Sequence, residues 1–268
     1  MQAEVKKAYV DTPAGQVHYR YRAGSGVPVV FLHQTASSSA MFEAMMAAYP
    51  GEERLVALDT PGFGGSFDPP GQPVIRDYAG WLADAAAALG LDRYHLFGHH
   101  TGACVGVEMA AAWPERVASL AIIGPVVLSA EERDTFRELY PKAFRPSPDG
   151  AHLQKMWAYV REIGGDDLSL ELWQREFTDT SRAWQGHIQV YSTIWDQDFG
   201  ALLERVSAPL LMMCSPGDVL WPVFDRARHL RPDAEFMELG GTNFQPDQEP
   251  ARIAEVLAAF LRGLPGAG

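Results

Sequence analysis

The stretch between residues 97 and 103, FGHHTGA, constrains the fold of this chain more than any other. It follows an apolar run at 94–97 and opens a run of small residues at 103–113. The two glycines lack a Cβ, so a strand and a helix can approach each other closely around a sharp turn. The pattern therefore predicts a strand, a tight turn that exposes the side chain of His100, and a helix.

Apolar strands and helical patterns alternate along most of the chain. Short apolar runs rich in branched residues at 27–32, 54–59, 117–123 and 210–214 predict strands that are covered on both faces. Such alternation predicts the α/β class, with a mostly parallel central sheet and helices on both faces.

Residues 126–205 break this alternation, because they are helical in character and rich in aromatic side chains. An insertion after the sixth strand is expected to lie over the carboxyl edge of the sheet, where ligands bind in such folds. We therefore predict a core domain formed by residues 1–125 and 206–268, and a helical cap formed by residues 126–205.

Composition narrows the class of partner. The formal net charge of −12 and the pI of about 5.1 argue against nucleic acid and anionic membrane surfaces. No apolar run reaches the length of a membrane span, and the first residues lack the apolar centre of a signal peptide. Cys104 and Cys214 stand in apolar surroundings and are predicted to be buried free thiols. These features predict a cytoplasmic protein, either a monomer or a homodimer.

Four blocks of sequence resemble the α/β-hydrolase superfamily, and the resemblance extends over nearly the whole chain. Residues 31–38 (FLHQTASS) resemble the oxyanion loop, and residues 59–66 (DTPGFGGS) resemble the loop Asp-x-Pro-Gly-x-Gly-x-Ser. Residues 98–102 resemble the nucleophile elbow, and residues 215–222 (SPGDVLWP) resemble the loop that carries the acid of the catalytic triad. The resemblance implies an α/β-hydrolase fold, an active site without a cofactor, and a cap after the sixth strand.

The departures from the family pattern matter as much. Gln34 replaces the usual glycine after His33, and His100 stands where the family carries its nucleophile, usually serine. Asn243 stands where the catalytic histidine is usual, whereas the acid, Asp218, is present. A Ser-His-Asp acyl-enzyme mechanism is therefore not available at these positions.

Each of the three candidate catalytic residues has two interpretations. His100 is placed to act as a general base or nucleophile, or it marks a turn without a catalytic role in a binding protein. Asp218 would orient an imidazole or hold a cationic group, or it merely caps the next helix from a Pro-Gly-Asp turn. Asn243 could bond to Asp218, to the substrate or to a water, or it suits a loop position with positive φ.

The resemblance also implies an oxyanion hole formed by the backbone N–H groups of Thr35 and Thr101. The side chain of Gln34 would add a donor, or it packs the loop. Cap aromatic residues are expected to form an apolar pocket. The residues predicted to contact an apolar or aromatic small-molecule substrate are Gln34, His33, Trp157, Trp184 and Trp221.

The remaining histidines offer a possible metal site, a packing residue and a cap residue near the pocket. His33, His99, His100 and Asp218 could hold a metal ion, but no helical histidine spacing supports such a site, so none is predicted. His99 is interpreted as a packing residue. His187 is the cap histidine best placed to reach the pocket, although an exposed position on the surface is favoured.

Three functions remain open from the sequence. The favoured one is a cofactor-independent hydrolase that acts on an ester, a lactone or a C–C or acyl bond, with His100 as general base or nucleophile. The second is an enzyme that uses acid–base chemistry without hydrolysis: a lyase, isomerase, cyclase or cofactor-free oxygenase. The third is a non-catalytic receptor for an apolar small molecule.

Overall fold

The structure, a computed structural model, describes residues 4–139, 144–166 and 168–264. The parts of the predicted core and cap at residues 1–3, 140–143, 167 and 265–268 lie outside this description. None of the described helices is both long enough and apolar enough to cross a membrane.

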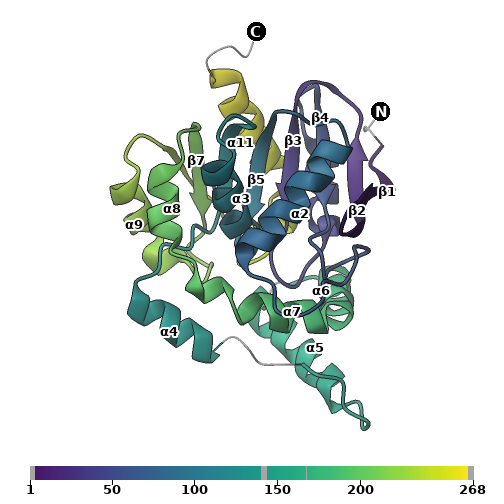
Figure 1. Cartoon of the computed structure of the whole chain (residues 1–268). Helices are drawn as coiled ribbons and strands as arrows, with labels where there is room; N and C mark the ends of the chain where they lie inside the picture. Colours follow the sequence, from purple (N-terminus) through teal and green to yellow (C-terminus); the bar gives the residue numbers. More distant parts are fainter. Residues whose placement is uncertain (1–3, 140–143, 167, 265–268) are drawn as a thin grey trace.

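An eight-stranded sheet forms the centre of the molecule (Figure 1). Its strands are β1 (Lys6–Thr12), β2 (Gly15–Arg22), β3 (Ser25–Leu32), β4 (Glu53–Leu58), β5 (Tyr94–His99), β6 (Val117–Ile123), β7 (Leu210–Cys214) and β8 (Glu235–Glu238). Their order is β1-β2-β4-β3-β5-β6-β7-β8. The pairs β1–β2 and β2–β4 are antiparallel and the other pairs are parallel, which confirms the predicted mostly parallel sheet.

Helices cover both faces of the sheet, as predicted. On one face pack α2 (Ile75–Ala88) and α3 (Thr101–Ala112), and on the other pack α1 (Glu43–Ala48) and α11 (Pro250–Gly263). Since successive side chains of a strand point to opposite faces, β3 contributes alternate residues to two separate apolar clusters. The parallel strands are therefore buried on both faces, which explains their continuous apolar sequences.

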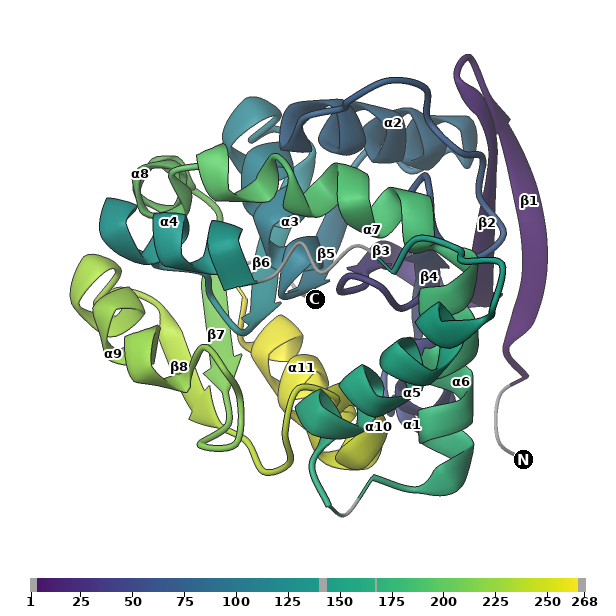
Figure 2. The ribbon, with the colours of Figure 1, turned by 90° about the horizontal axis from the view of Figure 1, so that it is seen from below.

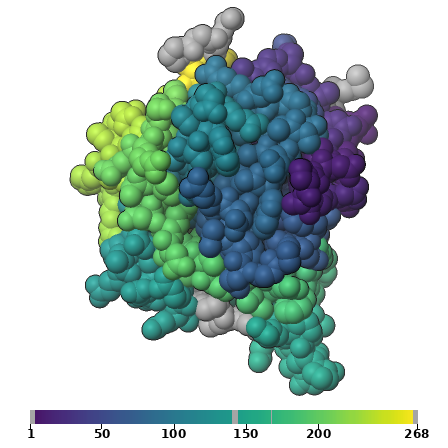
Figure 3. All heavy atoms as spheres, in the orientation of Figure 1, coloured from purple at the N-terminus to yellow at the C-terminus, as the bar shows by residue number. Residues whose placement is uncertain are grey.

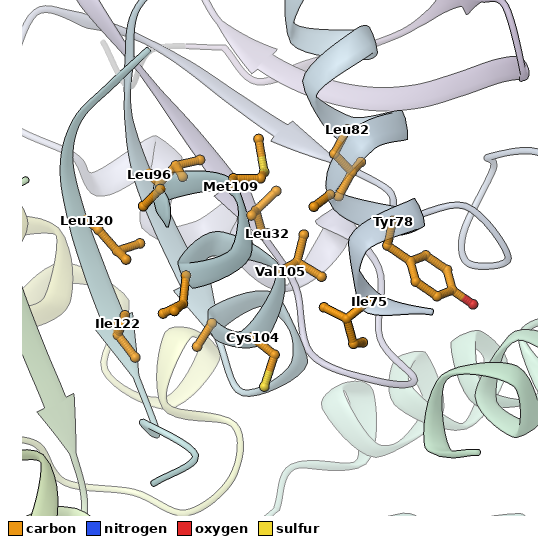
Figure 4. Packing of buried hydrophobic residues seen from close by; sticks show 14 of the residues in the cluster. Leu32, Ile75, Tyr78, Leu82, Leu96, Cys104, Val105, Met109, Leu120 and Ile122 are labelled. Carbon is orange, nitrogen blue, oxygen red and sulfur yellow. The ribbon is translucent and has the colours of Figure 1, made fainter. Parts of the chain in front are cut away.

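The apolar contact between α3 and the sheet holds the start of α3 in place. Figure 4 shows Leu32, Leu96 and Leu120 of the strands packed beside Val105 and Met109 of α3. All of these side chains are buried. Burial of side chains of this size contributes about 1.5–3 kcal/mol each, so the sheet and α3 form a rigid support for the turn between β5 and α3.

A series of helices follows β6 and precedes β7. These are α4 (Ala130–Leu139), α5 (Ala151–Gly164), α6 (Leu170–Arg182), α7 (Trp184–Tyr191), the 3₁₀ helix η2 (Ile194–Asp196) and α8 (Phe199–Arg205). Helix α8 packs beside α3, whereas α4 to α7 lie beyond one end of the sheet (Figures 1 and 2). In the space-filling view they form the lower end of the molecule (Figure 3).

The remaining elements follow loops at the ends of strands. They are the 3₁₀ helix η1 (Ser39–Phe42), α9 (Trp221–Leu230) and α10 (Gln245–Gln248). Cys104 and Cys214 are free and buried, as predicted.

Candidate active site

His100 lies in a strained turn between β5 and α3. Its backbone angles are φ 48° and ψ −106°, and it is the single non-glycine residue with positive φ in the described part of the chain. The glycine at 102 is required, because a Cβ there would lie 1.9 Å from the carbonyl oxygen of Leu32. The backbone N–H of His100 donates to Ile123 O at 3.0 Å, which fixes the turn to β6. Such strain is characteristic of functional sites.

The imidazole of His100 is oriented by two contacts. Its Nε2 lies 2.8 Å from Oδ2 of Asp218, within hydrogen-bond distance. Its Cδ2–Nε2 edge lies against Gly124, where a Cβ would come within 2.2 Å of His100 Cδ2. The opposite edge, which carries Nδ1, therefore points away from Gly124.

Asp218 is a buried carboxylate held by hydrogen bonds. It follows β7 in a turn, and its Oδ1 accepts from the backbone N–H of Leu220 at 2.8 Å. Its Oδ2 accepts from Nε2 of Gln245 at 2.6 Å, in addition to His100. Burial opposes ionisation, but the interaction with His100 and these donors outweigh it, so the pKa of Asp218 lies below its ordinary value. Asp218 is thus an ionised hydrogen-bond acceptor that favours a proton on His100 Nε2.

Gln245 is a site residue that the sequence analysis missed. It is fully buried at the start of α10, and its Oε1 lies 3.1 Å from Nε2 of His99. Because its amide nitrogen donates to Asp218, its oxygen must accept, and His99 Nε2 must carry the proton. Burial, together with the neighbouring His100, lowers the pKa of His99 far below its ordinary value, so His99 stays neutral. The signal was present in the sequence as a polar residue two positions after Asn243.

Thr35, Thr101 and Asn243 form polar parts of the wall beside His100. The N–H of Thr35 donates weakly to Thr101 Oγ1 at 3.3 Å, and the hydroxyl of Thr35 is buried with no partner in the described structure. The structure shows no hydrogen bond between Asn243 and His100 in its described part; Oδ1 of Asn243 accepts from the N–H of Val219 at 3.1 Å. It therefore fastens the loop that carries Asp218.

A cavity opens at His100. The space within it that is open to a water-sized molecule is about 50 Å³. Five residues predicted for the site line its polar part: Gln34, Thr35, His100, Thr101 and Asn243. The rest of its lining is apolar or aromatic and comprises Val126, Phe136, Tyr159, Ile163, Tyr191, Ile194, Trp195, Val219 and Leu220.

The predicted substrate contact of His33 requires correction. His33 is buried away from the cavity lining, and both ring nitrogens are occupied. Nδ1 lies 2.7 Å from Gln34 O, and Nε2 accepts from the N–H of Thr60 at 2.9 Å. Burial lowers its pKa, so the ring is neutral and joins the two loops as a structural link.

The three predicted substrate-binding tryptophans also lie outside the cavity lining, which instead contains Trp195. Trp157 stacks on Trp173 at 4.2 Å between ring centroids, and Trp221 packs against Phe224. Trp184 is half-buried at the first residue of α7. Trp157 and Trp221 therefore pack against neighbouring aromatic rings and do not line the cavity.

The expectation of an exposed His187 is wrong. Its side chain is buried beside the rings of Phe144, Tyr159 and Tyr191. Among the residues that the structure describes, its Nε2 has no hydrogen-bond partner, and burial lowers its pKa to about 4. His187 therefore packs as a neutral ring behind two residues of the cavity wall.

A metal ion could in principle be bound by His99, His100 and Asp218, whose donor atoms all lie within 4.8 Å of one another. In this arrangement, however, Oδ2 of Asp218 already accepts two hydrogen bonds, and Nε2 of His99 serves as a donor to Gln245. Nε2 of His99, Nε2 of His100 and Oδ2 of Asp218 are thus already engaged in hydrogen bonds, whereas Nδ1 of His99 is buried with no partner in the described structure.

Comparisons with known proteins agree with the fold. The model of the α/β hydrolase fold family matches residues 27–237. The chain is 28% identical to a fluoroacetate dehalogenase from Burkholderia sp, over 89% of this chain and 88% of that protein. It is 26% identical to carboxylesterase YbfK of Bacillus subtilis, over 97% of this chain and 89% of that one.

Solved structures show the same fold at low identity. The enol-lactonase of Burkholderia xenovorans superposes with a TM-score of 0.80 and 18% identity, over 95% of this chain and 99% of that chain.

Proposed function

The chain belongs to the α/β hydrolase fold family and is an enzyme of that fold, and we propose that it hydrolyses an ester, lactone or related acyl bond of an apolar or aromatic small molecule. The observation that carries the proposal is the hydrogen bond between His100 and Asp218 at the edge of the cavity. The relatives named as a dehalogenase and a carboxylesterase support hydrolysis.

The base would be Nδ1 of His100. Asp218 holds the proton on Nε2, so Nδ1 carries the lone pair. That edge of the ring points away from Gly124, and the residue lines the cavity. In the family pattern a histidine bridges the acid and a separate nucleophile. Here the acid, Asp218, is hydrogen-bonded directly to His100, the residue at the nucleophile position of the turn. The histidine therefore meets a water or substrate with no intervening side chain.

We propose general base catalysis. His100 Nδ1 takes a proton from water, and the hydroxide adds to the carbonyl carbon of the substrate. The tetrahedral intermediate then collapses, the bond to the leaving oxygen breaks, and that oxygen takes the proton from His100. Nδ1 is flanked by the Cβ of its own side chain, which leaves room for a water more readily than for an acyl carbon. Direct attack by Nδ1 would instead form an acyl-imidazole.

The oxyanion would be bound by the N–H groups of Thr35 and Thr101. The N–H of Thr101 opens α3, and the partial positive charge of a helix N-terminus favours an anion there. The N–H of Thr35 would exchange its weak acceptor, Thr101 Oγ1, for the substrate oxygen. Donors of this kind contribute about 3–4 kcal/mol each to the transition state.

The proposal is tested with p-nitrophenyl acetate as the probe. We expect His100→Ala and His100→Gln to remove hydrolysis, while the exposed-residue control His229→Ala keeps it. His100→Ser is expected to give no efficient esterase, because Asn243 cannot take the proton of the serine. A burst of p-nitrophenol equal to the enzyme concentration would indicate an acyl-imidazole instead of a general base. Wild-type rates in His100→Ala would favour the receptor function.

A further inference from the structure

Helix α6 is joined to the oxyanion loop (residues 33–38) by two hydrogen bonds, one buried and one partly buried. The hydroxyl of Ser37 donates to Oε1 of Glu176 at 2.9 Å, and that of Ser38 donates to Oδ2 of Asp179 at 2.7 Å. Glu176 and Asp179 are three residues apart and therefore lie on one face of the helix. Ser37, Ser38 and Glu176 are almost completely buried. These contacts link segments of chain that are about 140 residues apart.

The two serines lie close to the proposed oxyanion donor. Thr35 is two residues before Ser37, and the N–H of Ser37 donates to Gln34 O at 3.0 Å, which closes a turn around Thr35. A shift of this turn would move the N–H of Thr35 relative to His100. The carboxylates of α6 therefore act on the same loop that supplies this N–H.

The same helix also contacts α10, whose Gln245 donates a hydrogen bond to Asp218. Arg175 makes a two-point ion pair with Asp247 and also contacts Glu176. Asp247 lies in α10, two residues after Gln245, the donor to Asp218. Through Arg175, Glu176 and Asp179, α6 therefore contacts both the oxyanion loop and α10, whose Gln245 donates to Asp218.

The surroundings of Asp179 in α6 and of Asp247 in α10 oppose ionisation of these carboxyl groups. Burial, together with the charge of Glu176, raises the pKa of Asp179 to about 7. Burial also raises the pKa of Asp247 to about 6, although Arg175 opposes the shift.

We propose that Glu176 and Asp179 are positioning residues of the reaction. They hold the oxyanion loop through Ser37 and Ser38, and this keeps the N–H of Thr35 at its position beside His100. The inference rests on the proposed function, because it assigns the N–H of Thr35 to the oxyanion. It also means that the helices after β6 form a wall of the cavity and fix the catalytic geometry at the same time.

The test compares Glu176→Ala, Asp179→Ala and the loop double variant Ser37→Ala/Ser38→Ala. Glu171→Gln, an exposed change on the same helix, is the control. We expect amide hydrogen exchange in residues 34–38 to rise at least about tenfold in the three variants, with the sheet amides unchanged. We expect kcat for p-nitrophenyl acetate to fall roughly ten- to a hundredfold with KM nearly constant, because a misplaced donor costs rate. Asp179→Asn, which keeps an oxygen acceptor for Ser38, should restore most of kcat.

The two readouts separate the two proposals. If amide hydrogen exchange in residues 34–38 is unchanged in the variants, the positioning role is overturned, whatever the effect on kcat. Faster exchange with an unchanged kcat overturns the catalytic part of that role. If wild-type hydrolysis equals that of His100→Ala, the proposed function fails, and the assignment of the loop to an oxyanion fails with it.

Discussion

Asp218→Asn would test the hydrogen-bond logic of the site, because an amide has one acceptor oxygen where the carboxylate has two. In the native protein three donors meet Asp218: Leu220 N–H at Oδ1, and His100 and Gln245 at Oδ2. Whichever way the new amide turns, its NH₂ group faces at least one of these N–H donors. The substitution therefore cannot be accommodated without a lost hydrogen bond.

The two orientations have different costs. If the amide oxygen faces His100, the N–H of Leu220 is left unsatisfied at a cost of about 1–3 kcal/mol in stability. If the NH₂ group faces His100, Nε2 must become the acceptor and the proton moves to Nδ1, which removes the base. We expect the second outcome to dominate the kinetics, with a loss of about 10³-fold in kcat, equivalent to roughly 4 kcal/mol.

The assay is p-nitrophenyl acetate hydrolysis after subtraction of the His100→Ala rate, with a melting curve for each variant. Asp225→Asn, on the exposed side of α9, provides a matched control and should retain wild-type rates. A kcat within about threefold of wild type in Asp218→Asn would refute the argument that Asp218 selects the tautomer of His100.

Three further predictions concern neighbouring features. Gly124→Ala should lower kcat at least about tenfold, because its Cβ would fall 2.2 Å from His100 Cδ2; an active variant in which the His100 ring is undisplaced would contradict this contact. His187→Phe should raise stability more at about pH 5 than at about pH 8, by on the order of 1–2 kcal/mol. The reason is that the pKa of the buried ring is lowered to about 4, so the wild type loses stability as pH falls from about 6.5 towards 4; equal gains in urea unfolding at both pH values would refute it. Treatment with EDTA should leave hydrolysis unchanged, because Nε2 of His99, Nε2 of His100 and Oδ2 of Asp218 are already engaged in hydrogen bonds; loss of activity that zinc restores would instead establish a metal site.

The fold was accessible from sequence because it depends on local patterns. Continuous apolar runs marked the parallel strands, and the glycine at 102 marked the close approach of α3 to β3. His100 and Asp218 could be singled out because each follows a strand of the parallel sheet, and such loops meet at its carboxyl edge.

The rest of the site depends on contacts that no local pattern encodes. Glu176 and Asp179 have the spacing of any exposed helical face, and their partners lie about 140 residues away. The choice of Trp157 failed because aromatic content indicates a core but not which side chains face a cavity. The position of His187 was misjudged because a histidine can be buried without a charged partner. Burial lowers the pKa of its ring, which then stays neutral.

The central claim is that Asp218 holds His100 in the tautomer with the proton on Nε2 and leaves Nδ1 as the base. The most direct measurement is the nitrogen-15 NMR spectrum of the His100 ring, recorded at a pH where the ring is neutral, in wild type and in Asp218→Asn. The account predicts a protonated Nε2 and a bare Nδ1 in wild type, and a shift of the proton towards Nδ1 in the variant. A wild-type ring protonated on Nδ1 would contradict the account.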